Sequence, residues 1–192
     1  MSIRKRTGWF TVIVGIAIIA LVGVAAGPSA AAVHRTYSYE YGLDGWQKGF
    51  DGGGAWHMTR STDEAYTGAY SIECFIDGTA GMGTAWMMRS YTVPFDTLVD
   101  VRLTVQLYSH GVSDVNQSAV LGYFGTTPPT GRADFQTIGY TNMVAGWHGY
   151  QISGLQLTGQ YPARIWVAYG VATTWESTVE YYMDHVTVSV TP

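Results

Sequence analysis

The sequence has 192 residues, of which 47% are hydrophobic and 14% aromatic, and ten Lys and Arg stand against 14 Asp and Glu. An acidic chain without a long basic run argues against nucleic acid as a partner. Cys74 is the only cysteine, which excludes an internal disulfide framework. Its apolar surroundings predict a buried, unreactive thiol.

Residues 1–32 have the organisation of a secretory signal peptide. Three basic residues at positions 4–6 precede an uncharged apolar run at 9–26. Gly27-Pro28 then ends the helix, and the small residues Ala30–Ala32 offer a cleavage site. The alternative is an uncleaved membrane anchor, since the run approaches the roughly 18 residues that a spanning helix needs. The segment predicts an extracellular or cell-surface location, with a membrane as partner only if the segment is retained.

Cleavage after Ala32 would leave residues 33–192, a length that suits one domain with a single core. The basic residues at positions 4–6 would leave with the signal, so seven basic residues would remain against 14 acidic ones. Stability is then expected from the hydrophobic core, helped by a bound ion.

Short runs of alternating residues predict strands rather than helices along the rest of the chain. In the clearest run, Val99–His110, Val101 and Leu103 fall on one face while Arg102 and Thr104 fall on the other. This alternation is typical of a strand with one buried face. The other expected strands are Arg35–Tyr41, Ala55–Arg60, Tyr70–Ile76, Thr84–Val93, Ser118–Gly125, Asp134–Tyr140, Trp147–Leu157, Arg164–Val171 and Val179–Val190.

Turn-forming clusters separate these runs, among them Asp51–Gly54, Asp77–Thr79 and the Pro-containing surface loop Thr126–Gly131. About ten strands without intervening helices predict an all-β fold. The expected architecture is an antiparallel two-sheet jelly-roll β-sandwich.

Four segments, in chain order, resemble landmarks of one group of extracellular jelly rolls. Tyr39–Trp46 combines an aromatic-Glu strand with an Asp-Gly-Trp turn, and Arg60–Ile72 contains a glycine turn before an apolar strand. Gly146–Ile152 is similar to a late Trp-bearing strand, and Tyr181–Val188 to a closing strand with aromatic residues, Asp and alternating valines. The group is the calcium-bearing carbohydrate-binding modules, with related galactose-binding-like and MAM-like domains. The resemblance covers nearly the whole chain after residue 33.

A structural calcium ion is implied by this resemblance. Asp184 shares strand parity with Val186 and is expected to point inward, where an unpaired carboxylate would be costly. The family pattern brings Glu40 beside it, and backbone carbonyls near Thr67 and Ala69 would complete an oxygen cage for Ca²⁺. The alternative is that both carboxylates accept backbone N–H bonds.

A carbohydrate-binding face is the second expectation. Aromatic rings beside polar side chains suit the apolar faces and hydroxyl groups of sugars. Arg102, Gln106 and Tyr108 share one face of their strand, and Arg164 and Trp166 share a face of another. For a single aromatic residue, burial in the core is the stronger alternative. Trp46 and Trp147 are assigned to packing, and the further candidates are Trp56, Trp86, Tyr123 and Trp175.

Three functional hypotheses follow. The leading one is a secreted, non-catalytic module that binds a polysaccharide or other glycan on the sheet face bearing Arg102, Gln106, Tyr108 and Trp166. The alternative is a cell-surface or extracellular fibre subunit that binds copies of itself through exposed strands.

The third hypothesis is a polysaccharide lyase with a Tyr or His base, using Tyr108, His110, Gln106 and Arg102. Paired carboxylates in the pattern of jelly-roll glycosidases are absent from the sequence, so an enzyme is not expected. Asn116 begins a glycosylation sequon, which has meaning only in a host that glycosylates exported proteins.

Overall fold

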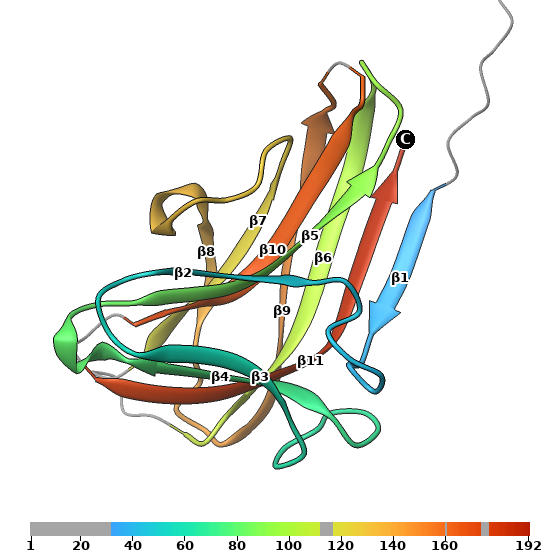
Figure 1. Cartoon of the computed structure of the whole chain (residues 1–192). Coiled ribbons are helices and arrows are strands. Elements are labelled where there is room, and N and C mark those ends of the chain that lie inside the picture. Colours follow the sequence, from blue (N-terminus) through green and yellow to red (C-terminus); the bar gives the residue numbers. More distant parts are fainter. Residues whose placement is uncertain (1–31, 112–116, 160, 174–176) are drawn as a thin grey trace, which may run out of the picture.

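The alternating segments pair into two antiparallel sheets that pack face to face in a jelly-roll β-sandwich (Figure 1), as predicted. The computed structural model describes residues 32–111, 117–159, 161–173 and 177–192. These ranges contain eleven strands and two short 3₁₀ helices, η1 (Gly78–Ala80) and η3 (Arg132–Asp134). No helix within them is long and apolar enough to cross a membrane.

Sheet A has the strand order β3-β4-β11-β6-β9, and β1 pairs with β11 beyond the end of β4. Its strands are β1 (Val33–Tyr37), β3 (Trp56–Ser61), β4 (Ser71–Asp77), β6 (Leu98–Ser109), β9 (Gly146–Leu157) and β11 (Thr178–Thr191).

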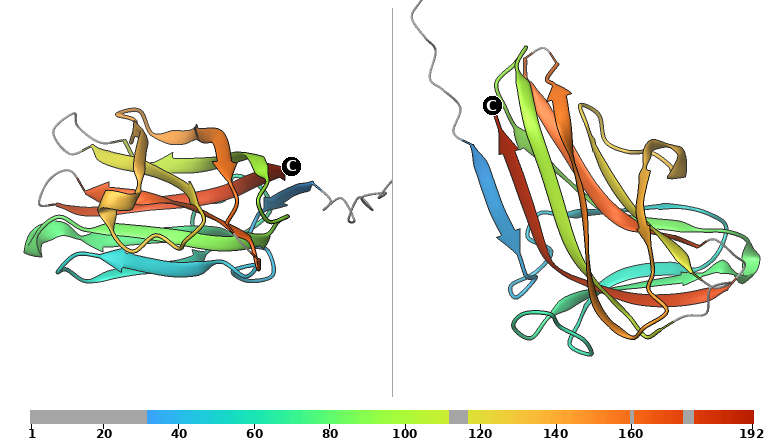
Figure 2. Two further views of the ribbon diagram at one scale, coloured as in Figure 1. Left: turned by 90° about the horizontal axis from the view of Figure 1, so that it is seen from above. Right: turned by 180° about the vertical axis from the view of Figure 1, so that it is seen from behind.

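Sheet B has the order β2-β5-β10-β7-β8. Its strands are β2 (Gln47–Asp51), β5 (Thr84–Thr92), β7 (Ser118–Gly125), β8 (Gln136–Tyr140) and β10 (Arg164–Thr173). Seen from behind, the strands of the two sheets lie in two layers (Figure 2). Each sheet therefore has one face toward the core and one outer face.

The core lies between the sheets and is built from the apolar side of each alternating strand. On β6 the inward residues are Val101, Leu103 and Leu107, and on β10 they include Ile165 and Val167, all fully buried. Each such side chain contributes about 1.5–3 kcal/mol relative to an exposed position.

Aromatic residues close the core near the turn between β1 and β2. Trp46 packs edge-on against Tyr37 and Tyr169, which confirms its assignment to packing. The hydroxyl groups of Tyr39 and Tyr169 hydrogen-bond to each other in the interior. Cys74 is fully buried, also as predicted, and burial raises the pKa of its thiol.

A β-bulge interrupts β11 between Asp184 and Thr187. Asp184 is opposite Gln106 on β6, whereas Val188 is opposite Leu103, so the alternation shifts by one residue within the bulge. His185 takes a positive φ of 48° there. The bulge therefore breaks the strict parity between Asp184 and the valines, but Asp184 is fully buried, as predicted.

Two boundaries near the N-terminal end also differ from the prediction. The first strand ends at Tyr37 rather than Tyr41, so Glu40 lies in the turn that follows β1. The chain then forms β2, which the sequence did not predict because its five residues include Lys48 and Gly49 and lack an alternating apolar pattern.

Candidate functional site

The predicted carbohydrate-binding residues lie on two opposite surfaces. Gln106 and Tyr108 belong to β6 and face outward from sheet A, as does Arg102. Arg164 and Trp166 belong to β10 in sheet B and face outward on the other side of the sandwich. The prediction that one face carries both sets is therefore wrong, because strand parity does not tell which sheet a strand joins.

The outer face of sheet B has a floor of very small residues, which we call the sheet B trough. Cross-strand register aligns Gly170 on β10 with Trp86 on β5, and Trp86 with Gly49 on β2. In the next row, Ala172 is aligned with Thr84 and with Ala119. The small outward residues of the trough are Gly49, Ala119, Gly125, Ala168, Gly170 and Ala172.

Trp86 fills the middle of this trough. A Cβ atom added to Gly49 would lie 2.1 Å from Cε2 of Trp86, and one added to Gly170 would lie 2.8 Å from Cα of Trp86. Phe135 packs over the indole at 5.4 Å between ring centroids. The Trp86 side chain is consequently almost fully buried, and its Nε1 has no hydrogen-bond partner among the described residues. Trp86 is a packed side chain of a small buried cluster on this face rather than an exposed platform.

An open hollow of about 600 Å³ lies at the end of the trough next to β2. Arg132 from η3 and Asp51 from β2 stand at its rim, where the Arg132 amide donates to Asp51 Oδ2 at 2.9 Å. Exposed Met82 borders it on another side. The lining residues are Asp51, Gly52, Met82, Thr84, Ala119, Arg132, Ala172 and Thr173.

The loop that carries Arg132 is held in place by its own hydrogen bonds. The Asp134 carboxylate accepts from the amides of Thr130 at 2.6 Å and Gly131 at 3.2 Å. Together with the Thr130 hydroxyl, these amides lower the pKa of Asp134. The Arg132 guanidinium donates to the carbonyl of Phe135 and to the hydroxyl of Thr137. The rim of the hollow is thus fixed by the fold.

Two partly exposed aromatic residues continue the trough away from the hollow. Tyr123 packs against Phe135 and donates its hydroxyl hydrogen to the Thr127 carbonyl at 2.7 Å. Trp166 lies further along, opposite Gly125 on β7 and Ser90 on β5. Aromatic side chains, small floor residues and a polar rim together suit a ligand with apolar faces and hydroxyl edges.

The outer face of sheet A carries a different surface, an aromatic stripe that crosses three strands and one loop. Tyr108 contacts Tyr182 on one side and Trp147 on the other, with ring centroids 6.2 and 5.4 Å apart. Trp147 in turn contacts Tyr66 at 5.5 Å. The assignment of Trp147 to packing missed its outward position. Its pairing with Tyr108 across the sheet was not visible in the sequence.

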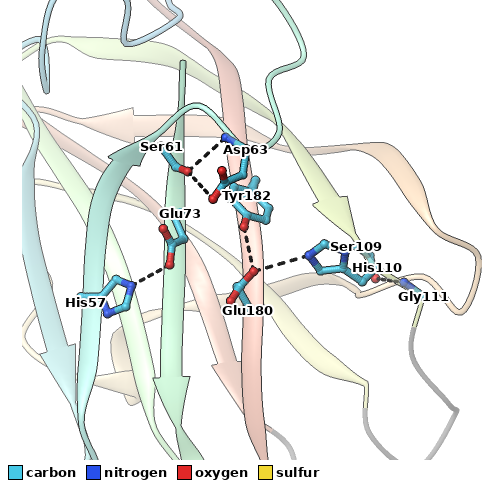
Figure 3. Close-up of polar contacts among 9 residues, drawn as sticks. All are labelled: His57, Ser61, Asp63, Glu73, Ser109, His110, Gly111, Glu180 and Tyr182. Carbon is cyan, nitrogen blue, oxygen red and sulfur yellow. Dashed lines mark hydrogen bonds and ion pairs between the residues drawn. The ribbon is translucent and has the colours of Figure 1, made fainter. Parts of the chain in front are cut away.

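Carboxylates and histidines lie near Tyr182, one member of this stripe (Figure 3). His57 Nε2 lies 2.8 Å from Glu73 Oε1, and His110 Nε2 lies 3.6 Å from Glu180 Oε1. Tyr182 donates its hydroxyl hydrogen to Glu180 at 2.7 Å. Burial, followed by Glu180, raises the pKa of Tyr182, and burial together with neighbouring Glu64 raises the pKa of Tyr108.

This charge pattern does not suit the lyase hypothesis. The carboxylates around Tyr108 and His110 would repel a uronate. Arg102, which would have neutralised the uronate, is six residues along β6 from Tyr108, about 20 Å for an extended strand. Tyr108 and His110 are in contact, with ring centroids 5.3 Å apart, but Arg102 does not join them.

Gln106 instead borders a smaller hollow of about 390 Å³ on the outer face of sheet A. The absence of a side chain at Gly149 opens the space beside it. The hollow is lined by Thr104, Gln106, Gly149, Tyr150, Gln151, His185 and Thr187.

Glu40 and Asp184 meet the same turn, which spans residues 66–70. Glu40 Oε1 accepts from the amides of Ala69 and Tyr70 at 3.0 and 3.1 Å. Asp184 Oδ2 accepts from the amides of Tyr66 and Thr67 at 3.0 and 2.8 Å and from the Thr67 hydroxyl. Burial raises the pKa of the Asp184 carboxyl against the opposing effect of these hydrogen bonds.

The chemistry of this donor set fits a hard cation in part. Two carboxylates and one hydroxyl surround one turn, and oxygen ligands of this kind suit Ca²⁺. Amide hydrogens of Thr67 and Ala69, rather than their carbonyls, point at the carboxylates. The described residues contain no group of three or more His, Cys, Asp or Glu side chains placed to hold a metal ion. Any further ligands would have to be backbone carbonyls, neutral side-chain oxygens or water.

Two predicted residues, Asn116 and Trp175, lie outside the described residues. Trp56 stacks on Phe50 at 4.9 Å and packs against the core, which favours the core alternative for this side chain.

Comparison with known proteins supports the fold. No family model matches the sequence, and no curated protein matches it significantly. Among solved structures, the chain is similar to the N-terminal modules of Clostridium thermocellum endo-1,4-beta-D-xylanase 10B in complex with xylohexaose, at 16% identity and a TM-score of 0.52. That match covers 81% of this chain and 28% of the xylanase.

Two matches cover nearly all of the other chain. TmCBM61 in complex with beta-1,4-galactotriose matches at 13% identity and a TM-score of 0.51, over 80% of this chain and 97% of that one. The K1 cleaved adhesin domain of Lys-gingipain from Porphyromonas gingivalis matches at 12% identity and a TM-score of 0.52, over 81% and 97%. These likenesses define the class of the fold, a β-sandwich shared with carbohydrate-binding and adhesin modules.

Proposed function

We propose that the chain is a non-catalytic carbohydrate-binding module that binds a glycan chain in the sheet B trough. The observation that carries this proposal is the hollow of about 600 Å³ over a floor of small residues, with Asp51 and Arg132 at its rim. The fold shared with modules crystallised with xylohexaose and beta-1,4-galactotriose supports the same class of ligand.

The length of the trough favours an oligosaccharide over a single sugar. Ala172 lines the hollow, and Trp166 lies six residues away on the same outer side of β10, about 20 Å in an extended strand. Trp166 would stack against one sugar unit while Asp51 and Arg132 hydrogen-bond to the hydroxyl groups of another. A ligand that uses both ends must be a chain.

The proposal includes a calcium ion at the turn held by Glu40 and Asp184. The ion would hold the turn at residues 66–70 against β11 through Asp184, and its role would be structural. It takes no part in glycan binding, because Glu40 and Asp184 bind the turn at residues 66–70 and neither lines the hollow of sheet B.

Calorimetric titration with oligosaccharides of increasing length tests the function. Xylan- and galactan-derived oligomers are suitable probes, and the wild type is expected to bind longer oligomers more tightly. Trp166→Ala should remove this gain with length while leaving the melting temperature nearly unchanged, since Trp166 is partly exposed. Tyr108→Ala, on the outer face of sheet A, is the matched control and should bind as the wild type does.

The opposite pattern would overturn the assignment of the face. If Tyr108→Ala loses binding and Trp166→Ala does not, the ligand lies on sheet A beside the smaller hollow. If no glycan in a broad panel binds, the carbohydrate function itself is wrong.

A further inference from the structure

One end of the sandwich exposes large apolar side chains, which we call the apolar apex. Five residues with relative exposures between 53% and 82% form it: Phe95, Leu98, Leu155, Leu157 and Tyr161. Single exposed apolar residues are ordinary on a protein surface, but a contiguous group marks an interaction site.

The register places the three leucines of the apex together. Leu98 and Leu157 are direct cross-strand partners at the end of the β6–β9 pair. Leu155 is two residues from Leu157 on the same outer side of β9 and lies opposite Asp100. Further along β6 the outward residues become polar, beginning with the exposed Asp100 opposite Leu155. The leucines are therefore confined to this end of the strand pair.

The turns that carry Phe95 and Tyr161 are bound to each other. The Asp96 amide donates to the Gly159 carbonyl at 3.3 Å, and the buried Thr158 hydroxyl donates to the Pro94 carbonyl at 2.8 Å. The Thr97 amide also donates to the Thr158 hydroxyl at 2.9 Å. These hydrogen bonds fix the two turns to each other and keep their apolar side chains at the surface.

β1 begins at the same end of the domain (Figure 1). Val33, the first residue of β1, pairs with Val190, which pairs with Val101 on β6. Two strand spacings, about 10 Å, therefore separate the start of β1 from β6 near the apex. The uncharged apolar run at residues 9–26 ends only six residues before β1, a span of about 20 Å even when fully extended.

We propose that the apolar apex is a membrane-contact surface that rests on the bilayer holding the N-terminal apolar run. Leucine, phenylalanine and tyrosine side chains are suited to the boundary between lipid head groups and acyl chains. The contact requires the alternative in which residues 1–32 are retained as an anchor. A bilayer is then favoured over a second copy of the chain because the uncharged apolar run at residues 9–26 ends six residues before β1. The inference does not depend on glycan binding.

This orientation also places the hollow of the sheet B trough away from the membrane. Thr84, which lines the hollow, begins β5, whereas the same strand ends at Thr92 next to the apex turn. The hollow is thus at the end of the sandwich that faces solvent.

Site-directed fluorescence tests the contact in the full chain reconstituted into phosphatidylcholine–phosphatidylglycerol vesicles. Leu157→Cys carries an environment-sensitive label at the apex, and Ala80→Cys carries it on exposed η1 at the other end of β5. Buried Cys74 does not compete for the label. With a quencher attached to the lipid acyl chains, the label at position 157 should lose most of its emission and shift to shorter wavelength. The label at position 80 should keep its emission.

Equal emission at both positions, or failure of the full chain to bind the vesicles, would overturn the proposal. The label at position 157 could instead shift to shorter wavelength as protein concentration rises, without being quenched by the lipid. That result would assign the apex to contact with a second copy of the chain. Unchanged melting temperatures of both labelled variants confirm that the comparison is between folded proteins.

Discussion

The indole ring of Trp86 lies directly over Gly49 on the neighbouring strand, with room for no side chain between them. A Cβ at position 49 would be 2.1 Å from Cε2 and 2.3 Å from Nε1 of Trp86. Gly49→Ala must therefore displace the ring or separate β2 from β5. We expect a loss of about 1–3 kcal/mol in the free energy of unfolding, as for overpacking in a core.

Urea unfolding followed by tryptophan fluorescence measures this effect, because a displaced Trp86 also changes the native spectrum. Gly53→Ala is the matched control, since a Cβ there would meet only the Ala80 carbonyl, at 3.8 Å. It should lie within about 0.5 kcal/mol of the wild type. A Gly49→Ala protein as stable as this control would show that Trp86 does not occupy the position described.

The ionisation of Asp184 reports whether calcium binds the turn at residues 66–70. Burial raises the folded-state pKa of this carboxyl, so without a cation its contribution to stability is present at low pH. That contribution is lost as pH rises through the folded pKa. A bound Ca²⁺ favours the charged carboxylate and reverses the sign, so that stability falls as pH falls.

The measurement is the difference in unfolding free energy between the wild type and Asp184→Asn, from about pH 4 to pH 7, in EDTA and in calcium. In EDTA, we expect the unfolding free energy of the wild type, relative to that of Asp184→Asn, to increase toward low pH. In calcium, we expect the same difference to increase toward neutral pH. Identical curves in the two buffers would remove calcium from the proposed function.

The carboxylate of Glu40 leaves no room for a side chain at position 68, so we expect the turn to require Gly68. It has a φ of +69°, and a Cβ there would lie 2.3 Å from Glu40 Oε1. Gly68→Ala should be destabilised by about 1–2 kcal/mol from the backbone conformation alone, and further by the contact. In a Glu40→Ala background only the backbone effect remains. A double-mutant cycle should therefore show a coupling of about 1 kcal/mol, and additivity would mean that Glu40 is not held against the turn.

The Cys74 thiol should be unreactive in the native protein. It is fully buried between sheet neighbours, and burial raises its pKa, so little reactive thiolate is present. A disulfide reagent at neutral pH should modify it only at the rate of unfolding, and the rate should rise steeply with urea. Rapid stoichiometric modification without denaturant would contradict the burial of this strand.

The fold could be predicted from the sequence because the alternation of apolar and polar residues is a local property of each strand. Leu103 and Arg102 are separated into inner and outer sides by parity alone, and β6 follows that prediction over its whole length. Parity failed where the backbone departs from a regular strand. The left-handed conformation of His185 belongs to a non-glycine residue, so nothing in its identity signalled the bulge that separates Asp184 from the valines.

The candidate site was less predictable because it depends on strand order and on missing side chains. Tyr108 and Trp166 seemed equivalent in the sequence, yet they lie on opposite sides of the sandwich. The trough owes its shape to Gly49, Gly170 and neighbouring alanines, residues that carry no functional signal in a sequence. Convergence of Glu40 and Asp184 on one turn was expected from the family resemblance, and the amide donors that meet them were the alternative to calcium that the sequence left open.

The position of β11 has a consequence for the order of events in synthesis. This strand is hydrogen-bonded to β4, β6 and β1, so it holds sheet A together from the middle. The ribosome makes residues 178–191 after every other strand of the sheet, and until then β1 and β4 have no central partner. Sheet A therefore cannot be completed until the last of its strands has been made. Such delayed closure is compatible with threading through a translocation pore, the route that the N-terminal sequence predicts.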